Sequence, residues 1–415
     1  MSKRVVITGM GTITPLGNNL TDFWNGIKDN KIGYSYIDTF DTSDIDVKIA
    51  GIVRDFDITK YGIDKKEAKK LVRFTQFALG ASKEALADCN TDFADLNPYR
   101  MGIILGCGIG GLSVTEQEYG KFLEKGANRV SAFYIPTSII NMACGEVAMK
   151  TGFKGANFAT VTACASSTHA IGETFRKIKD GYLDVAITGG TESCISPFTV
   201  GGFNNMKALT KCTDLAKASI PFDVERSGFV LGEGSGMLIL EELEHAKSRG
   251  AKIYAEVVGY GATCDGYHMT SPAPDGVPAG EAMKMAMEEA GCTPQQVQYI
   301  NAHGTSTGLN DKYETNSIKY ALGDSAKNVK INSTKSMIGH LLGGAGAVEA
   351  IVTAKSIQEG FIHATVGTHN PDVENGCDLD YCINGNINMD IEYALSNSLG
   401  FGGHNASICL KKYHE

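Results

Sequence analysis

Residues 178–183 (IKDGYL) return as residues 357–362 (IQEGFI), and this repeated stretch decides the fold. Each copy closes a helical stretch at a glycine, Gly181 in the first and Gly360 in the second. A glycine at that place is typical of a left-handed C-terminal cap, because it adopts positive φ without a steric penalty. The repeat therefore predicts two equivalent helices, far apart in the chain.

The two predicted helices share further features. Each follows a turn rich in Ser, Thr and Gly, and each carries apolar residues on one face: Ile171, Phe175 and Ile178 in the first, and Val348, Ile351 and Val352 in the second. We interpret the repeat as a duplicated architecture, with halves at residues 1–252 and 253–415. No Pro- or Ser-rich linker separates them, so we expect one packed core.

Short apolar runs alternate with helical stretches along the whole chain. The runs that read as strands are residues 5–8, 101–105, 185–188, 236–240 and 254–258. Buried strands rich in Val, Ile and Leu that alternate with helices indicate an α/β protein in layers.

Composition excludes several classes of protein. The chain has 415 residues, which is too many for one small core, and a net charge of −9 with no basic stripe interleaved with aromatics. No apolar run reaches membrane-spanning length. Eleven cysteines without a CxxC pair argue against a disulfide framework. We therefore expect no nucleic-acid partner, no membrane insertion and a cytoplasmic location.

Cys164 differs from the other ten cysteines in its surroundings. Residues 161–167 (VTACASS) join an apolar strand to the first repeated helix, so Cys164 is expected on a sharp turn at a helix N-terminus. Unpaired N–H groups and the helix dipole there favour a thiolate. The alternative role of a free cysteine is that of a small buried hydrophobe. We predict that Cys164 is a nucleophile facing backbone donors.

Two histidines end strand-like runs in small, polar turns. His303 lies in residues 299–307 (YINAHGTST), and His340 closes residues 332–340 (NSTKSMIGH), ahead of a glycine-rich turn. Imidazole can act as acid, base or hydrogen-bond donor near neutral pH. A structural role is the alternative for either histidine taken alone.

These segments together resemble a known family. TACASS with Cys164, NAHGTST with His303, NSTKSMIGH with Lys335 and His340, and GFGG at residues 400–403 occur in the order typical of the elongating 3-oxoacyl-carrier-protein synthases. Residues 221–234 (PFDVERSGFVLGEG) are similar to a further signature of that family. The likeness covers nearly the whole chain. It implies a thiolase-like α/β fold with duplicated five-stranded halves, a five-layer α-β-α-β-α arrangement and a homodimer.

The resemblance also implies a reaction, the decarboxylative Claisen condensation of malonyl-acyl-carrier protein with an acyl group held on Cys164. The backbone N–H groups of Cys164 and Phe401 would form the oxyanion hole. His303 and His340 would stabilise the enolate, and Lys335 would support the local electrostatics. No cofactor would be required, because the acyl-carrier protein delivers its own phosphopantetheine arm.

Further site residues follow from the resemblance alone. Phe401 would gate the acyl tunnel with Gly402 and Gly403 beside it, Ile109 would shape the acyl pocket, and Thr305 and Thr307 would bind the phosphopantetheine arm. For each, ordinary packing or turn capping is the alternative.

Two larger sets are implied in the same way. Carrier-protein docking would use Lys65, Lys66, Lys69, Lys70, Lys125, Arg129 and Lys207, and a solvated charged face is the alternative. A structural cation would be held by Asn301, Glu349, Ser396 and Asn397. The alternative there is a charge interaction between Glu349 and Lys335.

Three other kinds of protein are alternatives to an elongating synthase. A ketosynthase of a type II polyketide pathway uses the same chemistry on a different acyl chain. A thiolase would show a second cysteine in a CxG setting near the C-terminus, and none is seen. A scaffold that only binds acyl-carrier protein would not need Cys164, His303 and His340 together.

Overall fold

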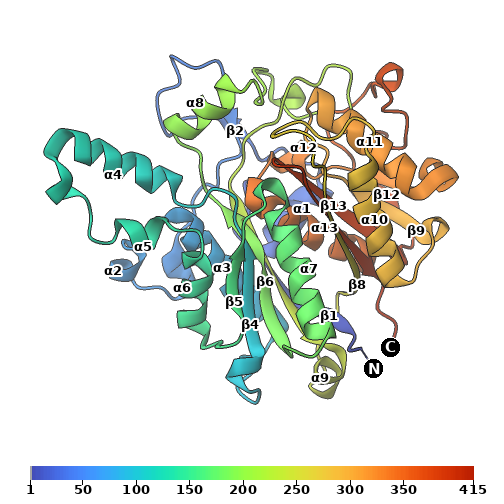
Figure 1. The fold of residues 1–415 in the computed structure, drawn as a ribbon, viewed down its shortest axis with the longest axis horizontal. Helices are drawn as coiled ribbons and strands as arrows, with labels where there is room; N and C mark the ends of the chain where they lie inside the picture. Colours follow the sequence, from blue (N-terminus) through green and yellow to red (C-terminus); the bar gives the residue numbers. More distant parts are fainter. Residues whose placement is uncertain (1) are drawn as a thin grey trace.

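The computed structural model describes residues 2–415, and the ten strands of its main sheet form two sets of five (Figure 1). The first set is, in spatial order, β5 (Asn157–Thr160), β4 (Met101–Gly106), β6 (Val185–Glu192), β7 (Gly234–Glu242) and β1 (Val5–Ile13). The second is β8 (Ala255–Cys264), β14 (His404–Lys411), β13 (Tyr393–Gly400), β9 (Val297–Asn301) and β10 (Lys330–Asn332). All five predicted runs lie in or against strands, which confirms them.

The two sets are hydrogen-bonded to each other at one short joint. Residues 5–7 of β1 pair antiparallel with residues 255–257 of β8, so one continuous sheet crosses both halves. The strands before the joint come from residues 5–242 and those after it from residues 255–411. The domain division at residues 252 and 253 stays a prediction.

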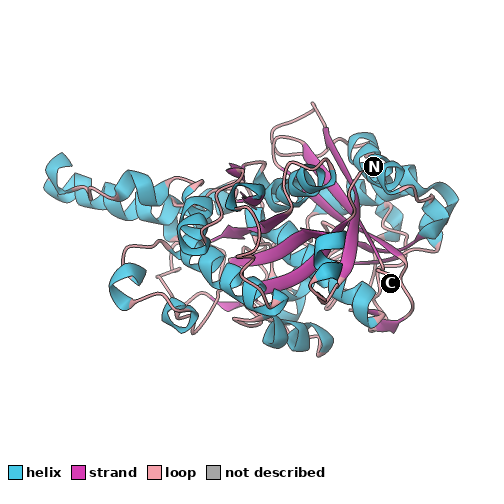
Figure 2. Cartoon of the chain, turned by 90° about the horizontal axis from the view of Figure 1, so that it is seen from below, coloured by secondary structure: helices cyan, strands magenta, loops and turns pink. Residues whose placement is uncertain are grey.

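Helices form three layers around the strands, as Figures 1 and 2 show. The central layer is α7 (Ser166–Lys179) and α13 (Ala345–Glu359), which contact each other and strands of both sets. One outer layer is α3 (Arg73–Cys89) and α6 (Met142–Thr151), and the other is α10 (Val277–Ala290) and α11 (Gly308–Leu322). This arrangement confirms the thiolase-like α-β-α-β-α architecture.

The repeated glycines end the two central helices as predicted, with one difference. Gly360 is the cap residue of α13 and has φ of 63°. In α7 the cap residue is Asp180, and Gly181 follows it with φ of 79°. The left-handed residue thus comes one position later after α7, where the N–H of Tyr182 bonds to the carbonyl of Lys177 and closes the turn.

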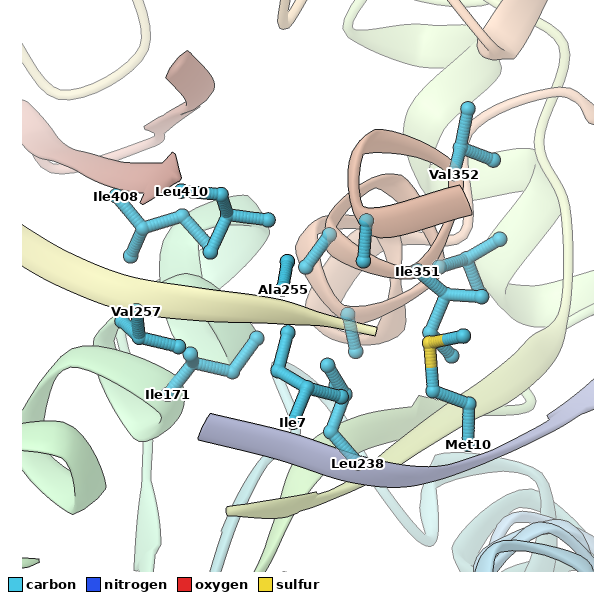
Figure 3. Close-up of a cluster of buried hydrophobic side chains, with 14 of the residues drawn as sticks. Ile7, Met10, Ile171, Leu238, Ala255, Val257, Ile351, Val352, Ile408 and Leu410 are labelled. Atoms are coloured by element: carbon cyan, nitrogen blue, oxygen red, sulfur yellow. The ribbon is translucent and has the colours of Figure 1, made fainter. Parts of the chain in front are cut away.

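The apolar faces of α7 and α13 are buried in the largest hydrophobic cluster. Ile171, Ile178, Ile351 and Val352 are each at most 1% exposed there. Figure 3 shows these two helices meeting side chains of β1, β7, β8 and β14. Burying one such aliphatic side chain stabilises the fold by about 1.5–3 kcal/mol. The central layer is therefore fixed by packing from both sides.

The remaining elements surround this core. The other helices are α1 (Leu20–Lys28), α2 (Lys65–Ala68), α4 (Leu112–Lys125), α5 (Tyr134–Ser138), α8 (Pro197–Asn205), α9 (Leu243–Ser248) and α12 (Lys335–Ile338). The two-residue strands are β2 (Ser35–Tyr36), β3 (Ile49–Ala50), β11 (Phe361–Ile362) and β12 (Ile387–Asn388). Figures 1 and 2 both show α4 projecting from the body. Among the helices of residues 2–415, none combines the length and hydrophobicity needed to cross a membrane.

The central layer gives a stability prediction. Ile351→Ala should lower the free energy of unfolding by about 3 kcal/mol, because it removes a fully buried side chain and leaves a cavity between two strand sets. Urea unfolding followed by circular dichroism measures the change. Val373→Ala, at a position that is 59% exposed, is the control and should change it by less than about 0.5 kcal/mol. Equal effects of the two substitutions would contradict the packing argument.

Candidate active site

Cys164 lies on the predicted turn between a strand and a helix. It occupies a 3₁₀ turn (Ala163–Ala165) directly before α7 and is 7% exposed. The preceding Ala163 has φ of 50°, a left-handed conformation that few residues other than glycine adopt. The nucleophile candidate is thus held on a strained turn at the start of the central helix.

The glycine loop at residues 400–403 touches this turn. A Cβ atom on Gly400 would lie 2.5 Å from the carbonyl oxygen of Thr162 and 3.3 Å from the Cys164 nitrogen, so only glycine fits there. Burial raises the pKa of the Cys164 thiol, and the backbone N–H of the next residue, Phe401, is close enough to the sulfur to oppose that rise. Both N–H groups expected for the oxyanion hole therefore lie at one end of Cys164.

Three side chains from distant segments converge in this place. The sulfur of Cys164 and one ring nitrogen each of His303 and His340 lie within 4.8 Å of one another. The two imidazole rings are 5.2 Å apart between centroids and nearly perpendicular, at 83°. Both histidines are only 2% exposed. One small group bound here could contact all three side chains at once.

Hydrogen bonds fix the tautomer of both neutral imidazoles. The N–H of Leu342 donates to Nδ1 of His340 at 3.2 Å. The Lys335 ammonium, which has donors only, lies 3.4 Å from Nδ1 of His303. Since both Nδ1 atoms accept, the proton of each neutral ring is on Nε2. The rings therefore present N–H donors rather than lone pairs.

Burial keeps the side chains of Cys164, His303 and His340 uncharged. Desolvation, followed by the charge of Lys335, lowers the pKa values of His303 and His340 well below 6.5. Desolvation raises the pKa of the Cys164 thiol to about 12, although Lys335 opposes this rise. The expectation of a thiolate was wrong, because complete burial outweighs the helix dipole and the nearby cation.

Lys335 is buried and paired with Glu349. The ammonium and the carboxylate form a fully buried ion pair, each side chain being 1% exposed. Lys335 begins α12, five residues before His340, whereas Glu349 lies in the first turns of α13. The pair thus ties the histidine-bearing segment to the central helix.

Backbone contacts hold each histidine in place. The N–H of His340 donates to the carbonyl of Val230 at 2.7 Å, and the His340 carbonyl accepts from Gly232 at 2.9 Å. The N–H groups of His303 and Gly304 both donate to the Glu314 carboxylate at 2.7 Å. Residues 228–234 therefore hold the backbone of His340 in place through these two hydrogen bonds. Glu314 was not predicted, since a carboxylate that binds backbone N–H groups leaves no local sequence pattern.

A cavity of about 520 Å³ connects the site to the surface. Its deep walls include Cys164, His303 and His340, and its outer walls include Met206 and Leu309, which are 47% and 49% exposed. Ile109, Thr305, Thr307, Phe401 and Gly403 line this cavity, but Gly402 does not. The hydroxyls of Thr305 and Thr307 are 2.9 Å apart and bond to each other.

The residues expected to dock a carrier protein lie in three places. Lys65, Lys66, Lys69 and Lys70 are exposed in and after α2, and within residues 2–415 none of the four forms an ion pair. Lys125 ends α4 and Arg129 follows it, and both are exposed. Lys207 is exposed and is the one member of this set that lines the cavity.

The residues expected to hold a cation fit that role in part. Asn301 and Ser396 are register partners on β9 and β13, and Glu349 lies on α13, which packs against both strands. Oδ1 of Asn301, Oε2 of Glu349 and Oγ of Ser396 are buried without a hydrogen-bond partner in the described part of the chain. Asn397 differs, because its Oδ1 accepts from the Ser407 hydroxyl. Three unpaired buried oxygens are a donor set suited to a hard cation.

Comparison of the sequence with known proteins gives one consistent result. Residues 2–246 match the family described as beta-ketoacyl synthase, N-terminal domain, and residues 254–369 match its C-terminal domain. A 3-oxoacyl-[acyl-carrier-protein] synthase 2 of Synechocystis is 50% identical over 99% of this chain and 98% of its own. The protein of that name from Staphylococcus aureus strain N315 is 47% identical, over 99% of both chains.

Solved structures agree with this result. A beta-ketoacyl synthase from Burkholderia phymatum has a TM-score of 0.92 and 32% identity, covering 99% of this chain and 100% of its own. A structure described as a type II polyketide acyl-carrier protein in complex with its ketosynthase, bound to a hexaketide, also has a TM-score of 0.92. Its identity is 33%, and the match covers both chains completely.

The burial of the imidazoles gives a prediction about pH. Because their pKa values are depressed, His303 and His340 should remain neutral at pH 6, where free imidazole is mostly protonated. Below pH 6.5 the unfolded chain takes up protons on these two rings and the folded chain does not. The free energy of unfolding should therefore fall as the pH falls below 6.5. NMR of ¹³C-labelled histidine, assigned with His303→Gln and His340→Gln, measures both charge and tautomer. Protonated rings at pH 6, or neutral rings with hydrogen on Nδ1, would contradict the analysis.

Proposed function

The chain belongs to the beta-ketoacyl synthase family, and on that premise we propose that it elongates acyl chains by decarboxylative condensation, with Cys164 as its nucleophile. It is an acyltransferase of the condensing type, like the relatives named 3-oxoacyl-[acyl-carrier-protein] synthase 2. The observation that carries the assignment of residues is the convergence of Cys164, His303 and His340 within 4.8 Å in a cavity open to the surface.

The first half of the reaction is acyl transfer. The Cys164 sulfur attacks the thioester carbonyl of an acyl-carrier protein, and the thiol proton passes to the sulfur of the departing arm. The carbonyl oxygen becomes negative in the tetrahedral intermediate. The N–H groups of Cys164 and Phe401 are suited to bind that oxygen, since they lie beside the sulfur that attacks. The acyl chain then extends along Ile109.

The second half is condensation with a malonyl thioester. The malonyl carboxylate leaves as carbon dioxide, and the electron pair of the broken carbon–carbon bond stays on the thioester as an enolate. Two neutral Nε2–H donors, from His303 and His340, can stabilise the enolate oxygen without protonating it. The enolate carbon then attacks the acyl carbonyl, and the Cys164 sulfur departs as a thiolate, which takes up one proton from water to restore the resting thiol. Lys335 acts behind His303, where it holds the tautomer.

We also propose a structural cation beside the site, bound by Asn301, Glu349 and Ser396. Their unpaired buried oxygens support it, and a cation would neutralise the Glu349 oxygen that Lys335 does not contact. Its role would be electrostatic support of α13, with no step in the reaction. Elemental analysis of the purified protein for monovalent and divalent ions tests this, and Ser396→Ala should lower the occupancy. No other cofactor is required by the proposed chemistry.

The proposed protein partners are the acyl and malonyl forms of an acyl-carrier protein. The relatives are named for that carrier, and one structural neighbour is described in complex with it. The exposed lysines at residues 65–70 and the exposed Lys207 at the cavity support docking of an acidic carrier. Carrier chemistry and eleven free cysteines favour the cytoplasm as location.

A second copy of the chain is the proposed permanent partner. The edge strand β5 has a free side and exposes Phe158, and apolar side chains are also exposed in α4 (Leu123), in α5 (Ile135) and directly before α5 (Phe133). An unpaired strand edge flanked by apolar side chains suits pairing with its own copy. Sedimentation velocity at micromolar concentration should give twice the chain mass of 44.2 kDa, and a monomer would overturn this proposal.

A polyketide ketosynthase is the second candidate function. One specific observation favours it, the TM-score of 0.92 to a type II polyketide ketosynthase complex. Sequence identity decides between the two candidate functions. The chain is 47–50% identical to the relatives named 3-oxoacyl-[acyl-carrier-protein] synthase 2 and 33% identical to that polyketide neighbour. We therefore propose fatty acyl elongation as the physiological reaction.

Replacement of the nucleophile tests the proposed function. Cys164→Ala should abolish acyl-enzyme formation and lower the condensation rate by about 10³-fold or more, because no covalent intermediate can form. Intact-protein mass spectrometry after incubation with acyl-carrier substrate measures the acyl adduct, and Cys194→Ala is the control at another buried cysteine. An adduct on a different cysteine of the active wild type would refute the assignment.

Charge reversal tests the docking surface. Lys65→Glu with Lys69→Glu should raise the KM for carrier-bound substrate by about tenfold at low salt and change kcat little, since the attraction to an acidic carrier becomes repulsion. Steady-state kinetics at two ionic strengths measure this. The same reversal at the exposed Lys154 and Lys327 is the control. An unchanged KM at low salt would discard this docking surface.

A further inference from the structure

Glu192 is a buried carboxylate at the end of β6 that binds two separate loops. It is fully buried and accepts the backbone N–H groups of Gly108 at 2.8 Å, Ile109 at 3.1 Å and Gly110 at 2.8 Å. It also accepts the N–H of Gly343, from the other half of the chain, at 3.2 Å. The Glu192 carboxylate therefore accepts hydrogen bonds from four backbone N–H groups.

Each of the two loops contributes residues to the wall of the cavity. Ile109 lines the cavity, on the side proposed for the acyl chain. Gly343 follows Leu342, which lines the cavity as well and donates its N–H to Nδ1 of His340. Glu192 is thus the direct link between the loop beside the acyl chain and the loop that orients His340.

Close packing makes this link stiff. A Cβ atom on Gly343 would lie 2.2 Å from the Gly108 nitrogen, and one on Gly108 would lie 2.9 Å from a Glu192 oxygen. The two loops therefore lie in contact around the carboxylate, with no space for a side chain between them. A displacement of one loop must be passed to the other or must break hydrogen bonds to Glu192.

The chemistry of the contact requires a carboxylate. Four N–H donors point at two oxygens, and an ionised carboxylate only accepts. A glutamine would place an NH₂ group against at least two of those donors. Hydrogen bonds from the N–H groups oppose the rise in the pKa of Glu192 that burial causes, so they favour the charged acceptor.

We propose that Glu192 is a positioning residue that couples the loop of Ile109 to the loop of His340, so that the length of the bound acyl chain affects the condensation step. A chain that presses on Ile109 shifts a loop whose N–H groups are bound to Glu192, and the shift reaches Leu342 through Gly343. The donor geometry of His340 then depends on what Cys164 carries. This inference rests on the proposed condensing function.

Separate rates for the two half-reactions test the coupling. Single-turnover condensation with malonyl-carrier protein is measured on enzyme preloaded with acyl chains of graded length, and loading is followed by mass spectrometry. In the wild type, the condensation rate should vary with chain length. In Glu192→Gln it should fall by about tenfold and lose most of that variation, whereas the chain-length profile of loading should change by less than about twofold.

Glu241→Gln is the matched control. Glu241 is fully buried on the neighbouring strand β7, at the opposite end of the β6–β7 pair, where it accepts from Thr8 and Arg249. This variant should retain the wild-type chain-length profile. Should Glu192→Gln not fold, Glu192→Asp keeps the charge but reaches fewer donors, and it should give a partial loss of the same profile.

Three outcomes are distinct. A wild type that neither loads nor condenses acyl groups refutes the proposed function itself. A wild type whose condensation rate does not vary with chain length overturns the coupling, and so does a Glu192→Gln variant that is uniformly slower with an unchanged profile. Loss of the profile in Glu192→Gln alone, with thermal stability near that of Glu241→Gln, supports the coupling.

Discussion

The packing of α7 against α13 between the two strand sets is the contact on which the site depends. Cys164 lies at the start of α7, and Glu349 in α13 binds Lys335, which sets the tautomer of His303. Both helices are buried from two sides, so neither can shift without opening the largest hydrophobic cluster. The packed core therefore fixes the position of the Cys164 sulfur relative to the two imidazoles.

The electrostatic design follows from that burial. A charged imidazole would attract and trap an enolate, whereas a neutral N–H donor stabilises the negative oxygen and leaves its carbon reactive. Desolvation together with the charge of Lys335 keeps both rings neutral, and the same desolvation makes Cys164 a thiol at rest. The charge needed for attack therefore has to develop as the thioester binds, next to the N–H groups that receive it.

Local patterns were sufficient to predict much of this. The strand-to-helix position of Cys164, the polar turns of His303 and His340 and the repeated glycines are all readable over a few residues. The β1–β8 joint, by contrast, pairs residues 250 positions apart and has no local signal. The same holds for Glu314 and Glu192, which bind backbone N–H groups of remote loops. The thiolate expectation failed because burial is a property of the whole fold, whereas the dipole of one helix is local.

The central claim is that His303 and His340 both donate from Nε2 to one substrate oxygen beside Cys164. The most direct measurement is a crystal structure with a malonyl-amide analogue of the thioester substrate, which cannot lose its arm. The carbonyl oxygen of the analogue is expected within hydrogen-bonding distance of both Nε2 atoms. The methylene carbon of the analogue is expected to face the Cys164 sulfur. An analogue bound in the cavity with its carbonyl oxygen contacting neither imidazole would contradict it.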